Sequence, residues 1–233
     1  MVINGDSYGH GGDIYKNRIR LDFSVNVNPL GTPQNVQRAA ADAAKSLSAY
    51  PDPYCGMLRK KLADTLGTDV QDILCGNGAA ELIFQFALAL RPGKVILPVP
   101  SFSEYETALD AAGCRPEFYP LRRENGFALT EEILDVITDD TELLMLCSPN
   151  NPTGLCVPWE LLERILSRCR ETGTWLFLDE CFLDLADQDK MRSLIPELRE
   201  NDRVFLLRAF TKLYGMAGVR LGYAVCKKRD MME

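Results

Sequence analysis

The chain has 233 residues, of which 46% are hydrophobic and 25% are charged, a composition typical of soluble globular proteins. The formal net charge is -7 and the basic residues are scattered, so the sequence lacks the basic surface that binds nucleic acid. No apolar run is long enough to cross a membrane and the first residues lack the pattern of a signal peptide, so we expect a cytoplasmic protein without membrane partners. Eight cysteines form no CxxC pair and there is one histidine, so no metal site is expected.

The first part of the chain differs in composition from the rest. Segments such as "HGGDIY" and "FSVNVNPLGTP" are rich in Gly, Pro and Asn and indicate turns, followed by helices near residues 34 to 48 and 57 to 66. We therefore expect an amino-terminal arm, residues 1 to 30, and one large domain, residues 31 to 233.

From about residue 70 onward, short apolar runs alternate with helical patterns. The runs are apolar throughout rather than at every second position, which is typical of parallel strands that are covered on both faces. The fold class predicted is α/β, with a mostly parallel sheet between two layers of helices. The strands are expected around "DILC", 95 to 100, 142 to 148, 174 to 180 and 203 to 210, and the helices at 101 to 113 and 158 to 173.

Polar and aromatic residues follow five of these strands at the point where each strand ends. Parallel α/β sheets bind their ligands outside the carboxyl ends of the strands, so these residues are expected to meet at one edge of the sheet. They are the Gly76-Asn77-Gly78 turn, Phe102, Asn151, Asp179 and Lys212.

Lys212 follows the strand "VFLLRAF", a place where an ordinary surface lysine is also common. In a pocket beside another cation, however, the pKa of a lysine falls, and the neutral amine can condense with a carbonyl group. Arg220 could supply that cation, and between Gly218 and Gly222 it could also bind a phosphate with its guanidinium fork. A carbonyl compound that carries a phosphate suggests pyridoxal 5'-phosphate.

The other strand-end residues have plausible places around such a cofactor. Asp179 could pair with a protonated pyridine nitrogen, although a capping or salt-bridged aspartate is an equal alternative. Asn151 of "SPNNPTG" could bond the phenolic oxygen, and Phe102 could stack on the ring, although a turn and a core aromatic are the ordinary interpretations. Gly78 begins a helix whose amino terminus could bind the phosphate.

The motifs "SPNNPTG", "LFLDE" and "TKLYGMAGVRLGY", in this order and spacing, resemble the fold-type I enzymes that use pyridoxal 5'-phosphate. Within them the chain is similar to the subgroup of histidinol-phosphate aminotransferases and threonine-phosphate decarboxylases. The resemblance implies that residues 31 to 233 form the cofactor-binding domain of a homodimer. It assigns the covalent bond to Lys212 and the pyridine nitrogen to Asp179, and it assigns the remaining cofactor contacts to Asn77, Gly78, Phe102, Asn151, Thr211, Arg220 and the second subunit's Tyr50.

Three features of the resemblance favour the decarboxylase, which acts on O-phospho-L-threonine. The motif "HGGDIY" would place His10 and Gly11 on a small phosphorylated substrate, together with Asn26 and Asn151. Phe182 stands where the aminotransferases usually carry tyrosine, and Thr211 and Tyr214 follow the decarboxylase pattern. The aminotransferase is the alternative.

Two departures from the family pattern lead to a third interpretation. Ala209 replaces a hydroxyl residue that would bond the phosphate. The family also continues into a small carboxy-terminal domain, which carries arginines that grip the substrate and which these 233 residues do not include. The third interpretation is therefore a fragment that binds the cofactor without turnover.

Overall fold

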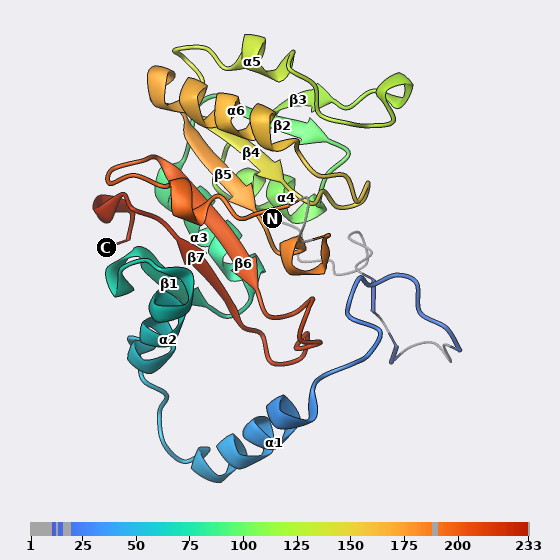
Figure 1. The fold of residues 1–233 in the computed structure, drawn as a ribbon, viewed down its shortest axis with the longest axis vertical. Coiled ribbons are helices and arrows are strands. Elements are labelled where there is room, and N and C mark those ends of the chain that lie inside the picture. The colour runs from blue at the N-terminus through green and yellow to red at the C-terminus, as the bar shows by residue number, and fades with distance from the viewer. Residues whose placement is uncertain (1–10, 13, 16–19, 188–190, 233) are drawn as a thin grey trace.

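A seven-stranded sheet forms the centre of the structure, a computed structural model that describes residues 11–12, 14–15, 20–187 and 191–232 (Figure 1). The strand order is β1-β7-β6-β5-β4-β2-β3, and β7 runs antiparallel to both of its neighbours while the other pairs are parallel. The strands are β1 (Ile73–Gly76), β2 (Val95–Val99), β3 (Glu117–Pro120), β4 (Leu143–Cys147), β5 (Trp175–Asp179), β6 (Val204–Ala209) and β7 (Gly222–Val225).

Helices cover both faces of this sheet, which confirms the three-layer α/β class. They are α1 (Gln34–Ala43), α2 (Gly56–Leu66), α3 (Ala79–Leu90), α4 (Ser103–Ala111), α5 (Ile133–Val136) and α6 (Trp159–Thr172). Buried residues of α2, α5 and α6 share one hydrophobic core with alternate strand residues such as Leu144 and Leu176. Residues of α3 and α4 pack on the other face against Met145 and Phe177. Because each central strand is buried on both sides, its sequence is apolar at nearly every position, and the exceptions are Asp179 in β5 and Arg208 in β6.

The five predicted strands are present, but β3 and β7 were not expected. Strand β3 lies at the edge of the sheet and is mostly exposed, so "EFYP" lacks the apolar run that marks the central strands. Strand β7 consists of the four buried residues "GYAV", which are too few to show a pattern in a glycine-rich stretch. The predicted sheet was mostly parallel, and β7 is its antiparallel member.

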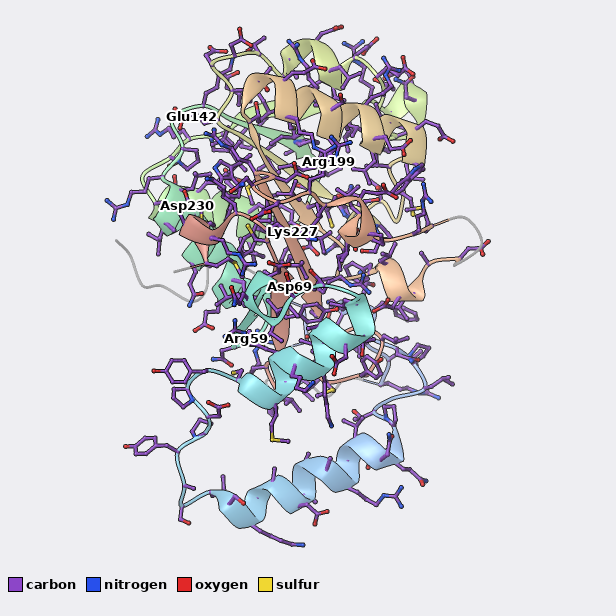
Figure 2. The ribbon with its side chains drawn as sticks, turned by 60° about the vertical axis from the view of Figure 1, so that its left-hand side comes forward. Arg59, Asp69, Glu142, Arg199, Lys227 and Asp230 are labelled. Atoms are coloured by element: carbon purple, nitrogen blue, oxygen red, sulfur yellow. The ribbon has the colours of Figure 1, made fainter. Side chains whose placement is uncertain are left out.

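The turn before β1 is fixed by α2. Arg59 on this helix donates from Nε and Nη2 to the carbonyl oxygen of Val70, at 3.2 and 2.9 Å. Asp69 caps the single helical turn from Val70 to Asp72, which leads directly into β1. Figure 2 shows Arg59 and Asp69 near α2. Strand β1 therefore enters the sheet at a defined position, and so does the glycine turn that follows it.

The segment that precedes α2 contributes little to either core. Helix α1 has no buried residue, and Figure 1 shows it apart from the sheet. The described residues before α1 form no helix or strand, and the division at residue 30 stays a prediction. No helix among the described residues combines the length and the hydrophobicity that a membrane span requires.

Candidate active site

A cavity of about 120 Å³ lies at the carboxyl ends of β4, β5 and β6, beside the first turn of α3. We call it the rim cavity. Its volume is several times what a single water molecule needs. Its lining includes six residues that the sequence indicated as site residues. The six are Phe102, Asn151, Asp179, Thr211, Lys212 and Arg220, and the others are Ala79, Ala80, Tyr105, Cys147, Cys181, Phe182 and Ala209.

The amine of Lys212 is partly buried in this cavity. Burial lowers the pKa of Lys212, and the positive charge of Arg220 acts in the same direction while Asp179 opposes it. The Nζ atom lies 4.8 Å from the centroid of the Phe182 ring. The sequence suggested a lysine beside a second cation in a pocket. In the structure Lys212 and Arg220 line the same cavity.

Because the pKa of Lys212 is lower in the folded chain than in the unfolded chain, its protonation opposes folding. The cost is fully present below the folded pKa, where the group is charged in both states, and it disappears as the pH rises above the unfolded pKa. Lys212→Met is therefore expected to raise the melting temperature of the cofactor-free protein at pH 7, and the difference should shrink towards pH 10. Melting curves at both pH values test this, and a variant that is less stable at pH 7 would show that the charge is well solvated.

Asp179 ends β5 with its side chain on the α3 and α4 face, and it is 5% exposed. One carboxylate oxygen accepts a hydrogen bond from the hydroxyl of Tyr105 at 2.6 Å, and the other accepts from the backbone N–H of Cys181 at 2.8 Å. Among the described residues no ion pair includes Asp179, so the salt-bridge alternative finds no support. A buried carboxylate that faces a cavity is suited to a positively charged ligand atom.

Tyr105 contacts Asp179 through its hydroxyl, and the sequence did not indicate it as a site residue. Burial, and then the charge of Asp179, raise the pKa of the Tyr105 hydroxyl well above its usual value, so it stays protonated and donates to Asp179. The only available signal was its spacing of three residues from Phe102, the residue before α4, and the two rings meet edge to face with centroids 5.6 Å apart. That spacing is equally typical of a core position.

Tyr105→Phe removes one hydrogen bond to a charged acceptor and leaves the ring in place. We expect the free energy of unfolding to fall by about 1.5 to 3 kcal/mol, with weaker binding of a cationic ring at Asp179. Urea titrations with and without pyridoxal 5'-phosphate measure both effects. Tyr119→Phe, on the opposite face of the sheet, is the control, and equal losses in the two variants would contradict a specific role for Tyr105.

The guanidinium of Arg220 lies against the amino terminus of α3, and we call this arrangement the cup. Gly78 has φ +82, and a Cβ atom placed on it would lie 2.6 Å from Nη2 of Arg220. Gly222 also lies close to the start of α3, since a Cβ atom on Gly222 would lie 2.7 Å from the backbone nitrogen of Ala79. A guanidinium above the positive end of a helix is a site for phosphate.

Asn77, which the sequence assigned to the phosphate, does not line the rim cavity. Its side chain is exposed, and its backbone N–H donates to the carboxylate of Glu81 at 2.6 Å. Glu81 lies in the first turn of α3, so it satisfies a free N–H of the helix end that a ligand could otherwise use. The cup therefore depends on Gly78 and Arg220.

Gly78→Ala is expected to push Arg220 away from the helix end. Both this change and Gly113→Ala introduce a side chain at positive φ, which costs about 1 to 3 kcal/mol, but nothing lies within 4 Å of the new Cβ at Gly113. Only Gly78→Ala should weaken binding of pyridoxal 5'-phosphate relative to pyridoxal, which has no phosphate. Binding titrations of both compounds test this, and equal effects on both would remove the phosphate role.

A larger cavity of about 680 Å³ adjoins the rim cavity and shares Asn151 and Phe182 with it. Asn26 lies in its wall, as the sequence indicated, together with other residues of the arm and of the loop after β5. We call it the outer pocket. The Phe182 ring, which borders both cavities, lies against the amine of Lys212.

Gly11 and Tyr50 line neither cavity, and the same is true of Asn77 and Gly78. Gly11 packs against the arm itself, since a Cβ on it would lie 1.9 Å from the carbonyl oxygen of Ser24. Tyr50, between α1 and α2, is fully exposed. His10 lies outside the described residues.

The residues of the rim cavity fit pyridoxal 5'-phosphate. Lys212 offers an amine for the aldehyde, Asp179 a buried carboxylate for the ring nitrogen, and Arg220 with the cup a place for the phosphate. Burial raises the pKa of both Cys147 and Cys181, so the two thiols add no charge beside Asp179.

Comparisons with known proteins agree with this fit. A family model described as aminotransferase class I and II matches residues 18–232. The chain is 41% identical to a threonine-phosphate decarboxylase of Salmonella typhimurium over 88% of its own length and 56% of the relative's. It is 35% identical to a histidinol-phosphate aminotransferase of Methanosarcina mazei, with 88% and 54% covered.

A solved structure gives the same result. The histidinol-phosphate aminotransferase of Clostridium acetobutylicum superposes with a TM-score of 0.79 at 29% identity, over 90% of this chain and 61% of that one. The chain thus spans little more than half of the length of the curated relatives it matches. It belongs to the class I and II aminotransferase family, whose members depend on pyridoxal 5'-phosphate.

Proposed function

We propose that this chain forms the cofactor-binding part of an enzyme that decarboxylates O-phospho-L-threonine to 1-amino-2-propanol phosphate, a step of cobalamin synthesis. The observation that carries the proposal is the placement of Lys212 and Asp179 in one cavity that opens onto the outer pocket. The higher identity to a protein named threonine-phosphate decarboxylase than to a histidinol-phosphate aminotransferase, 41% against 35%, supports this choice of reaction.

When bound, pyridoxal 5'-phosphate supplies a ring that accepts the electron pair left at the substrate's alpha carbon. Lys212, whose lowered pKa favours the neutral amine, would hold the cofactor through its aldehyde group. Asp179 would keep the ring nitrogen protonated, and Tyr105 orients the carboxylate of Asp179. Arg220 and Gly78 would hold the phosphate, and Phe102 and Asn151 would contact the ring.

The orientation of the substrate selects the reaction. If the residues that hold the substrate presented its carboxylate for bond breaking, decarboxylation would follow. If they presented the alpha hydrogen instead, Lys212 would be placed to take that proton as a base, and amino transfer would follow. In our proposal His10, Gly11, Asn26 and Asn151 set this orientation, and Phe182 leaves the ring oxygen without a tyrosine hydroxyl on that side.

The second candidate is an aminotransferase of the histidinol-phosphate type, favoured by the 35% identical relative and by the superposition with TM-score 0.79. Two assays separate the candidates: carbon dioxide release from O-phospho-L-threonine, and glutamate-dependent amino transfer to imidazole-acetol phosphate. We expect the first. Transfer without carbon dioxide would reverse the assignment, and cofactor binding with neither activity would identify this chain as a binding fragment.

We also propose that the enzyme is a cytoplasmic homodimer. Large apolar side chains are exposed along the arm and the segment up to α2, including Phe23, Leu30, Leu47, Tyr50 and Tyr54. A second copy would cover them and bring its Tyr50 to the phosphate. Sedimentation of the chain tests this, since a monomer at micromolar concentration would contradict it.

All eight cysteines are free thiols, as in proteins of the reducing cytoplasm, which supports the proposed cytoplasmic location.

A further inference from the structure

Lys212 lies on a loop that has no regular structure. This loop, which we call the lysine loop, joins β6 to β7 and spans residues 210 to 221, all in turns or irregular conformation. Backbone carbonyl groups in such a loop have no ladder or helix to satisfy them, so their partners must come from elsewhere. The position of the amine therefore depends on what binds this stretch of main chain.

Residues 28 to 32, at the junction of the amino-terminal arm and the large domain, provide those partners. The backbone N–H of Asn28 donates to the carbonyl oxygen of Lys212 at 3.0 Å, and the Asn28 side chain donates from Nδ2 to the carbonyl oxygen of Leu213 at 2.8 Å. The hydroxyl of Thr32 donates to the carbonyl oxygen of Gly215 at 2.7 Å. Figure 1 shows the segment that leads into α1 beside the loop between β6 and β7.

The two stretches of main chain are in direct contact. Gly215 has φ +60, and a Cβ on it would lie 2.9 Å from the carbonyl carbon of Gly31 and 3.0 Å from the nitrogen of Thr32. Any side chain at position 215 would separate the arm from the lysine loop.

Asn28 is held in this orientation by its own turn. Its Oδ1 accepts the N–H of Leu30 at 3.0 Å, and its carbonyl oxygen accepts the N–H of Gly31 at 3.0 Å. The side chains of Phe23 and Leu30 are about 90% exposed, so hydrophobic burial does little to dock this part of the arm. Within the described chain, the hydrogen bonds that connect residues 26 to 32 to distant segments all end on residues 212 to 215.

The same part of the arm lines the outer pocket, from Asn26 to Pro29. We propose that Asn28 is a positioning residue for Lys212, and that through it docking of the arm over the outer pocket and placement of the amine are coupled. A substrate that binds against the arm would then stabilise the lysine loop. The inference rests on the proposed function only in taking Lys212 as the reactive amine.

The test uses the cofactor-free chain, in which the rate of Lys212 acetylation by acetic anhydride reports the neutral fraction of its amine. Asn28→Ala loses the bonds to Leu213 and Leu30 and should release the loop into water. We expect amide exchange across residues 212 to 216 to accelerate about tenfold, and the pH midpoint of Lys212 acetylation to rise towards that of exposed lysines in the same digest. Peptide mass spectrometry measures both the amide exchange and the acetylation of Lys212.

Asn35→Ala, on the exposed face of α1, is the matched control and should change neither quantity. Asn28→Asp is the second variant, because it keeps the acceptor for Leu30 and removes only the donor to Leu213. It serves where Asn28→Ala fails to fold, and it should show the same faster exchange.

The outcomes separate this inference from the proposed function. An unchanged acetylation midpoint in Asn28→Ala would overturn the inference, even where exchange accelerates, because Asn28 would then be merely structural. A shifted midpoint in a protein that neither binds pyridoxal 5'-phosphate nor releases carbon dioxide would support the inference and contradict the proposed function. Unchanged exchange in both Asn28 variants would also overturn the inference.

Discussion

Lys212→Ala is expected to abolish the visible absorption band that the protein develops with pyridoxal 5'-phosphate. The band requires a covalent bond between a lysine nitrogen and the aldehyde carbon, and Lys212 is the lysine that lines the rim cavity. Any turnover should fall by several orders of magnitude, since covalent attachment and proton transfer are both lost. An absorption titration of the purified variant measures the first effect.

Lys60→Ala is the control for this experiment, because Lys60 is exposed and pairs only with Asp64 on α2. It should keep the full band. Circular dichroism must show that the Lys212 variant is folded. A folded Lys212→Ala protein that retains the band would show that another amine binds the cofactor, and the site described here would then be wrong.

Asp179→Ala is expected to weaken cofactor binding by about 3 to 5 kcal/mol, which corresponds to a factor of a hundred to several thousand in the dissociation constant. The reason is that a protonated ring nitrogen would lose its buried counter-charge, while Tyr105 would lose its acceptor. Fluorescence titration with pyridoxal 5'-phosphate measures the change.

Two further variants make this prediction specific. Asp179→Asn keeps the size of the side chain and an acceptor for Tyr105, so it should fold normally and still bind the cofactor poorly. Asp140→Asn changes an exposed carboxylate that pairs with Lys94, and it should bind normally. Wild-type affinity in Asp179→Asn would mean that the carboxylate is structural and does not meet the ring.

The fold was largely predictable because the central strands are buried on both faces. Continuous apolar runs such as those at β4 and β5 indicate covered parallel strands without further information. Strand β3 has no continuous apolar run, because an edge strand with exposed residues does not require one. Strand β7 also escaped prediction, because its four residues are too few to form a recognisable pattern.

The site was predictable where a residue's position follows from the end of its own strand. Asp179 and Lys212 are of this kind, since parallel strands bring their carboxyl ends to one edge. Tyr105 is not, because its role depends on the rotation of α4 relative to β5. The hydrogen bond from the backbone N–H of Asn77 to Glu81 was not predicted, because a sequence does not show which group accepts a given N–H. The phosphate contact of Asn77 stays a prediction.

The contact between Asn28 and the lysine loop is the least visible from the sequence. It joins residues 185 positions apart through hydrogen bonds to carbonyl groups, which every residue type carries. No composition or periodicity marks such a pairing. The arm could be predicted as a separate segment, but its attachment point could not.

The central claim is that Lys212 is the residue that bonds the cofactor. The most direct measurement is borohydride reduction of the protein with pyridoxal 5'-phosphate, followed by digestion and peptide mass spectrometry. Our account predicts that the stable pyridoxyl mass appears on the peptide that contains Lys212. A label on other lysines, or no label on a folded protein, would contradict it.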